Sequence, residues 1–250
     1  MDDREVIRPF ALASFRQLLA ASAHSPAMLS YLDNDANSKR KPNENYAREI
    51  MELHSLGAAV NGYPYTEQDV KEVARCFTGW TYQLREANGK PAGSFVFQAG
   101  QHDTGAKQVL GQTLPAGGAQ LDGDLVLHLL CRHAATPRYV GAKLLRRLVC
   151  DHPETDCPEL LDRVVAAWGK DGSIPELLRL IVGSAEFKAS FGRFGGKLVR
   201  PLDQAARMLR VLGWPAAEFG SLSSLILGGR GMLAGCGQLP FYWPTADGYP

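Results

Sequence analysis

Residues 41–57, KPNENYAREIMELHSLG, contain the clearest helix in the chain. Asn43 can cap the start of this helix, and Gly57 can end it. Apolar side chains recur at helical spacing along one face: Tyr46, Ile50 and Leu53. The stretch therefore predicts an amphipathic helix over residues 43–56 that packs onto a core by this face.

Helical patterning continues on both sides of this stretch. Further helices are predicted at residues 6–21, 26–32, 66–77, 122–133, 136–150, 156–168, 173–184, 201–212 and 221–227. Residues 80–85 and 94–98 instead alternate aromatic or branched residues with polar ones, and a turn-forming Asn-Gly pair lies between them. The predicted fold class is mainly α, a multi-helix single domain with a small β-hairpin near residues 80–98.

Residues 80–120 interrupt the helices as one insertion. The hairpin is followed by a Gly-rich stretch at 100–120, which we expect to be a long polar loop or a short piece of strand. Loops of this length are more often functional or mobile than neutral. We expect residues 1–250 to form one helical domain. Because the sequence stops within a loop, WPTADGYP, we expect it to be a fragment of a longer protein.

The composition is that of an ordinary folded protein and excludes two classes of function. The chain has 27 Lys and Arg against 26 Asp and Glu, a formal net charge of +1. Proteins that coat nucleic acid carry a strong basic excess, so nucleic acid is not an expected partner. No run of apolar residues approaches the roughly 18 that a membrane span needs, so no membrane span is expected.

The five cysteines include no C-x-x-C pair, so a structural zinc site has no support. The closest pair is Cys150 and Cys157. These are either buried thiols or, in an exported protein, a disulfide.

Four acidic or imidazole side chains are the candidate catalytic residues. Glu49 and Glu52 share one face of the helix quoted above. They are either solvated residues of an amphipathic helix or a carboxylate pair lining a cleft. His102 and Asp103 lie in the long loop, where Asp103 either orients His102 or bonds its own backbone in a turn. The same four residues are the candidate ligands of a divalent cation.

Three basic residues are candidates for binding an anion. Lys107 follows His102 in the loop, and Lys143 and Arg146 lie on the helix predicted at 136–150. A guanidinium fork suits a carboxylate. The alternative is that Lys143 and Arg146 only complement the dipole at the end of their helix.

Five stretches make the sequence similar to a bacterial family. They are residues 41–57, 65–82, 101–117, 122–149 and 237–250, in that order. Over essentially its whole length the chain resembles the family called domain of unknown function 1800. It looks like the central and C-terminal part of a longer member. The family carries no established reaction, so the resemblance implies a location and a partner rather than a chemistry.

The resemblance implies a periplasmic or otherwise exported protein. Members of the family are often encoded beside a second exported family, domain of unknown function 1501, which makes a protein of that family the candidate partner. Two functions are then open. One is a non-catalytic exported binding or assembly protein, favoured by the missing nucleophile and metal signature. The alternative is a metal-assisted or acid/base hydrolase that uses the Glu/His/Asp cluster.

Overall fold

Helices predominate in the computed structural model, as the sequence predicts. The structure describes residues 3–58, 64–87, 89, 91–191, 199–213 and 231–237. It divides into two compact units, residues 1–191 and residues 192–250. The helix predicted at 221–227 and the family-like stretch at 238–250 lie outside the described residues. Whether the whole chain folds as one domain stays a prediction.

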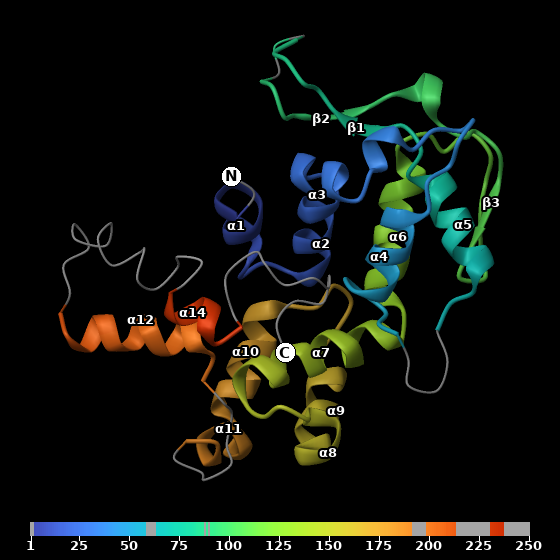
Figure 1. The fold of residues 1–250 in the computed structure, drawn as a ribbon. Helices are drawn as coiled ribbons and strands as arrows, with labels where there is room; N and C mark the ends of the chain where they lie inside the picture. The colour runs from blue at the N-terminus through green and yellow to red at the C-terminus, as the bar shows by residue number, and fades with distance from the viewer. Residues whose placement is uncertain are drawn as a thin grey trace. The chain divides into compact units, whose positions relative to one another are not determined.

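The first unit is a series of short helices with two hairpins between α5 and α6 (Figure 1). Its helices are η1 (Asp3–Ile7), α1 (Arg8–Phe10), α2 (Phe15–Ala23), α3 (Pro26–Tyr31), η2 (Asn34–Ala36), α4 (Asn45–Glu52), α5 (Glu67–Cys76), η3 (Ala99–Gln101), α6 (Leu121–Arg132), α7 (Ala135–Leu148), α8 (Pro153–Asp156), α9 (Pro158–Ala166), α10 (Ile174–Gly183) and α11 (Ala185–Ala189). Its strands are β1 (Trp80–Tyr82), β2 (Phe95–Phe97), β3 (Lys107–Val109) and β4 (Gln112–Leu114).

The second unit contains α12 (Pro201–Val211) and α14 (Met232–Gly235). Here α12 confirms the helix predicted at 201–212. Ala205 and Leu233 are buried against one another, with Leu209 packed beside them. The short helix α14 lies in a glycine-rich part of the sequence.

The helix predicted at residues 6–21 is divided in the structure, because a cap and a long-range bond interrupt it. Ser14 caps α2, and its hydroxyl accepts a hydrogen bond from the N–H of Gln17 at 3.2 Å. The N–H of Phe15 donates to the carbonyl of Gly172 at 2.7 Å. These bonds pull the backbone at Ser14 into an extended conformation, although the apolar periodicity runs through the break.

The helix predicted at 156–168 also differs at its start, since Asp156 is the last residue of α8 and α9 begins only at Pro158. Cys157 between them has φ −147°, outside the helical range, and Pro158 starts the second helix.

The predicted hairpin near 80–98 is confirmed, and a second one follows it. Strands β1 and β2 pair antiparallel with Trp80 opposite Phe97. Strands β3 and β4 also pair antiparallel, within the stretch expected to be a long polar loop or a short piece of strand. Their turn places Leu110 at φ 49°, which is costly for a side chain with a Cβ. Asp69 of α5 compensates by accepting a hydrogen bond from the N–H of Leu110 at 2.7 Å.

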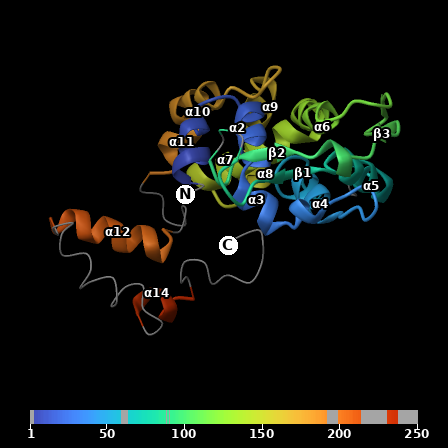
Figure 2. The same ribbon diagram turned by 90° about the horizontal axis from the view of Figure 1, so that it is seen from above.

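One hydrophobic core fills the first unit, and α4 packs into it by Tyr46 and Ile50 of the predicted apolar face, whereas Leu53 is only half-buried. Tyr46 and Ile50 of α4 are buried. The Tyr46 ring stacks on Phe77 with centroids 5.4 Å apart, and Phe77 lies 4.9 Å from Trp80 of β1. The two views agree that α5 lies beside β3 and that α3 lies beside β1 (Figures 1 and 2). Within the part of the chain that the structure describes, no helix is long and apolar enough to span a bilayer.

Candidate functional site

A buried polar cluster is formed by His102, which follows η3, Lys107 of β3 and Asp122 of α6. Their side chains are at most 1% exposed. The Oδ2 atom of Asp122 lies 3.1 Å from His102 Nε2 and accepts a hydrogen bond from Lys107 Nζ at 2.6 Å. Lys107 Nζ also donates to the carbonyls of Asp103 and Gly105, at 2.5 and 3.0 Å. All three protons of the ammonium group therefore have acceptors inside the protein.

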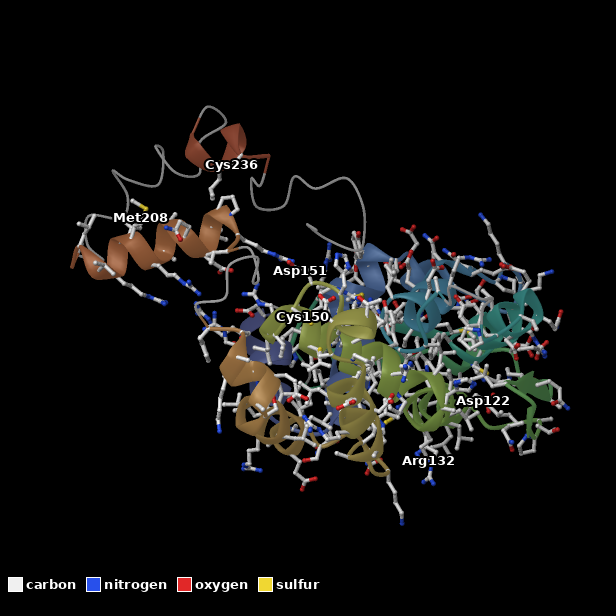
Figure 3. All side chains as sticks on the ribbon, turned by 90° about the horizontal axis from the view of Figure 1, so that it is seen from below. Asp122, Arg132, Cys150, Asp151, Met208 and Cys236 are labelled. Carbon is white, nitrogen blue, oxygen red and sulfur yellow. The ribbon has the colours of Figure 1, made fainter. Side chains whose placement is uncertain are left out.

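The position of Asp122 on α6 explains why a carboxylate can be buried here (Figure 3). Asp122 lies in the first turn of this helix, where the dipole favours a negative charge. Lys107 supplies the opposite charge, since a buried ion is tolerated only when it is paired and hydrogen-bonded. The second carboxylate oxygen of Asp122, Oδ1, is buried without a hydrogen-bond partner among the described residues. A Cβ at Gly118 would lie only 1.8 Å from this atom, so the chain needs glycine at that point.

The second ring nitrogen of His102 is also engaged. His102 Nδ1 lies 2.8 Å from the carbonyl oxygen of Thr78. A carbonyl can only accept, so Nδ1 carries a proton and donates. The hydroxyl of Thr78 accepts a hydrogen bond from the N–H of Asp103 at 2.9 Å. The imidazole therefore links the turn before β1 to the start of α6, and neither nitrogen is free to act on a substrate in this arrangement.

An outer layer of charges holds the same loop against α5. Arg75 grips the Asp103 carboxylate with two N–H groups, at 2.8 and 3.1 Å. This guanidinium lowers the pKa of Asp103 to about 2. Arg75 also donates to Glu72 at 2.7 Å, and Glu72 accepts from the N–H of Gln108. Asp103 Oδ1 accepts from the N–H of Gly105 at 2.9 Å, as the turn alternative requires, and its carboxylate makes no bond to His102 among the described contacts.

The four candidate catalytic residues do not come together as one group. His102 and Asp103 belong to the network above. Glu49 and Glu52 are half-buried on α4, and no hydrogen bond or ion pair within the described chain joins them to His102 or Asp103. Burial and the neighbouring Glu52 raise the pKa of Glu49. Across residues that the structure describes, no group of three or more His, Cys, Asp or Glu side chains is placed to hold a metal ion.

The three candidate anion-binding residues also lie apart. Lys107 is enclosed in the buried cluster. Lys143 donates to the carbonyl of Leu53 at 2.8 Å and lies over the ring of Tyr139, 4.8 Å from its centroid. Arg146 binds the carboxylate of Glu154 at 2.9 and 3.3 Å. Lys143 thus ties α7 to the end of α4, and Arg146 ties α7 to α8.

A polar pocket of about 270 Å³ lies directly beside the buried network. It is lined by Asp35, Ala36, Asn37, Ser38, Gly79, Thr81, Gln98 and Gln101. Backbone hydrogen bonds join its walls. The N–H of Gly79 donates to the backbone carbonyl of Asn37 at 3.1 Å, and the N–H of Lys39 donates to the backbone carbonyl of Gln101 at 2.7 Å. Gly79 follows Thr78 and Gln101 precedes His102, so the network and the pocket share a wall.

Gly79 has a specific role in this wall. Its φ is +79°, and a Cβ at this position would lie 2.6 Å from the carbonyl oxygen of Gln98. The N–H of Gln98 donates to the Gly79 carbonyl at 2.8 Å, so the two segments meet backbone to backbone. Only glycine allows this approach.

The opposite wall is held by buried asparagines that the sequence interpretation missed. The Asn37 amide donates to the Ala74 carbonyl at 2.9 Å, and its oxygen accepts from the N–H of Asn43. The Asn34 amide donates to the Trp80 carbonyl at 3.0 Å. The only signal in the sequence is the density of Asn and Asp between two helices, which is also typical of an exposed loop.

The similarity of this protein to known proteins concerns the whole chain and not this site alone. Searches of curated proteins and of solved structures find no match. A family model described as "Protein of unknown function (DUF1800)" matches residues 1–250. The match covers the complete chain and agrees with the resemblance carried by the five sequence stretches. This chain therefore belongs to the DUF1800 family.

Proposed function

We propose that this chain is a non-catalytic exported binding protein of bacteria, and that it holds a small, uncharged, polar ligand in the pocket beside Gly79. One observation carries the proposal. The titratable side chains of the family-like loop, His102, Asp103 and Lys107, all bind groups of the protein itself, and His102 bonds the Thr78 carbonyl next to the pocket. A catalytic site would need at least one of them to face the reacting group with a free nitrogen or oxygen.

The pocket lining indicates the chemistry of the ligand. Ser38, Thr81, Gln98 and Gln101 belong to the lining, and their hydroxyl and amide side chains can both donate and accept hydrogen bonds. Among the described residues that line the pocket, Asp35 is the charged one, and none is Lys, Arg or His. Phosphates and carboxylates are therefore disfavoured.

The volume limits the ligand further. Pockets for drug-sized molecules hold about 300–1,000 Å³, so this one, at about 270 Å³, is at the small end. A neutral polyhydroxylated molecule of monosaccharide size fits both the volume and the mixture of donors and acceptors.

The hydrolase alternative has less support. It needs Glu49 or Glu52 to act together with His102 or Asp103, and no hydrogen bond or ion pair of the described structure joins these side chains. The raised pKa of Glu49 is the feature that favours it, because a protonated carboxyl can serve as a general acid.

Export and a partner from the domain of unknown function 1501 family rest on the family resemblance alone. Cell fractionation of the native host would test the first prediction. Co-purification of the chain with the product of the adjacent gene would test the second.

The binding proposal is tested by calorimetry on the full chain against a panel of neutral monosaccharides, neutral amino acids and inorganic phosphate. We expect a neutral sugar to bind and phosphate not to bind. Gln101→Ala and Asp35→Asn should each weaken binding about tenfold, since the first removes a side-chain amide from the lining and the second replaces a charged acceptor oxygen by an N–H donor. Asp162→Asn is the matched control, because this exposed carboxylate pairs with Arg138 away from the pocket lining.

Two results would overturn the proposal. One is that nothing in the panel binds, or that binding is indifferent to Gln101 and Asp35. The other is chemical turnover of a bound compound that Glu49→Gln abolishes, which would establish the hydrolase instead.

A further inference from the structure

We propose that Cys150 and Cys157 form a disulfide bond whenever the chain is in an oxidising compartment, and that this bridge secures the connection from α7 to α9. The two sulfur atoms lie 3.2 Å apart. This inference is independent of the pocket, because neither cysteine belongs to the pocket lining or to the buried network.

The backbone already holds the two thiols face to face. Cys150 follows α7, and its N–H donates to the carbonyl of Leu145 at 3.2 Å. Cys157 lies where α8 ends and α9 begins, and its N–H donates to the carbonyl of Pro153 at 3.3 Å. The single turn of α8 reverses the chain between them, so an approach of about 1 Å by the sulfurs reaches bonding distance.

A second contact spans the same connection. Arg146 at the end of α7 binds Glu154 of α8, and Arg146 Nε also donates to the carbonyl of Asp151 at 3.2 Å. Figure 3 shows Cys150 and Asp151 next to one another at this connection. The segment is therefore fixed from its polar side by an ion pair, and the two thiols meet in its less exposed part.

The other cysteines are not arranged in this way. Cys76 and Cys131 are buried, and Cys131 Sγ contacts the carbonyl of Lys170 at 4.0 Å. Cys236 is exposed in the second unit. Among the described residues, the pair at 150 and 157 is the one in which two sulfurs touch.

The chemistry requires an oxidant, which we take to be the disulfide of a small molecule or of a thiol oxidoreductase. The Cys150 thiolate, on the more accessible of the two residues, attacks that disulfide, forms a mixed disulfide and releases one thiol. The Cys157 thiolate then attacks Cys150 Sγ and releases the second thiol. The two cysteines lose two electrons and two protons, and the oxidant gains them.

The surroundings make this exchange slow without a catalyst. Burial raises the pKa of Cys150, and burial together with the Cys150 thiol raises the pKa of Cys157 to about 12. Few thiolates are then present at neutral pH, and the thiolate is the attacking species.

The test uses the full chain refolded or incubated in a glutathione redox buffer of oxidising poise, then alkylated and digested with trypsin. Residues 148–163, LVCDHPETDCPELLDR, form one tryptic peptide that contains both cysteines. We expect this peptide to be unalkylated and lighter by two hydrogens than its reduced form. Cys236→Ser should give the same peptide, and Cys150→Ser should give a peptide with one alkylated thiol.

Thermal denaturation provides the second readout. Reduction should lower the Tm by about 5–10 °C, the effect expected of a short bridged loop in a chain of this size. The Cys150→Ser/Cys157→Ser variant should melt at the reduced value whether or not a reductant is present. The proposal is overturned if both cysteines of the folded chain stay alkylatable in the oxidising buffer, or if either is bridged to Cys76, Cys131 or Cys236.

Discussion

Lys107→Met removes one charge from an ion pair that water does not reach. The side chain of Lys107 is 0% exposed and that of Asp122 is 1% exposed. Met is close to Lys in length and fills most of its volume, so the variant chiefly deletes the ammonium group. Lost with it are the 2.6 Å bond to Asp122 and the bonds to two backbone carbonyls.

The expected cost is about 3–5 kcal/mol of unfolding free energy, the usual penalty for leaving a buried charge without its partner. The α6 dipole still favours the Asp122 carboxylate, and His102 still lies 3.1 Å from it, so we expect the lower half of this range, about 3–4 kcal/mol. Domains are stable by about 5–15 kcal/mol in total, so this loss is a large fraction.

Urea denaturation at pH 7, followed by far-UV circular dichroism, measures this change. The double variant Lys107→Met/Asp122→Asn should regain at least half of the loss, because it removes both charges at once. It also keeps the reasoning testable if Lys107→Met alone does not fold. The control is Lys71→Met, an exposed lysine of α5 whose replacement should change stability by less than about 0.5 kcal/mol.

The reasoning is refuted if Lys107→Met costs less than about 1 kcal/mol, a value typical of exposed pairs. It is equally refuted if Asp122→Asn makes Lys107→Met worse instead of better. Either result would mean that the ammonium group and the carboxylate do not neutralise each other in the folded protein.

Three further predictions concern the same unit. Gly79→Ala should lower the free energy of unfolding, measured by thermal denaturation, by about 1–3 kcal/mol more than Gly111→Ala does. Both glycines have positive φ, but only a Cβ at Gly79 meets a backbone carbonyl, at 2.6 Å. Equal losses for the two variants would contradict this. Burial and then Lys143 lower the pKa of His54 to about 4, so the unfolded chain binds a proton first, and stability should fall as the pH drops from about 6.5 to 4. His54→Gln should reduce this slope in urea midpoints, and an unchanged slope would refute the assignment. The pKa of Asp103 is also lowered, to about 2, so its contribution is present above about pH 4 and lost as the pH falls through 2. Asp103→Asn should therefore be less stable than the parent chain at pH 7 and nearly as stable at pH 2. A stability difference that does not change with pH would count against the lowered pKa of Asp103.

Local signals predicted much of the fold correctly. The helices predicted at 66–77 and 26–32 are present as α5 and α3, and a capping box of Thr66 and Asp69 starts the first of them. The first hairpin pairs at the predicted strands. These elements depend on residues within a few positions of one another, so a linear pattern contains the required information.

Three candidate residues belong to one network in the structure: His102 and Asp103, predicted to be catalytic, and Lys107, predicted to bind an anion. Their roles stay predictions. The sequence also grouped Glu49 and Glu52 with His102 and Asp103, because spacing shows that two side chains share a helix face but not what that face meets. Burial by tertiary packing decides whether such a group is exposed to a ligand or is enclosed.

What the sequence alone determined is therefore the helical class, most element positions, the apolar face of α4 and the family. Only the tertiary structure decided the role of Asp122, which looks like an ordinary first-turn residue of a helix, and the break at Ser14, which depends on Gly172. It also decided that a loop near residue 37 and a loop near residue 100 enclose a pocket. The physical reason is that helix formation is governed by neighbours along the chain. Ion pairing, caps formed across the fold and pockets depend on groups that become neighbours only when the core assembles.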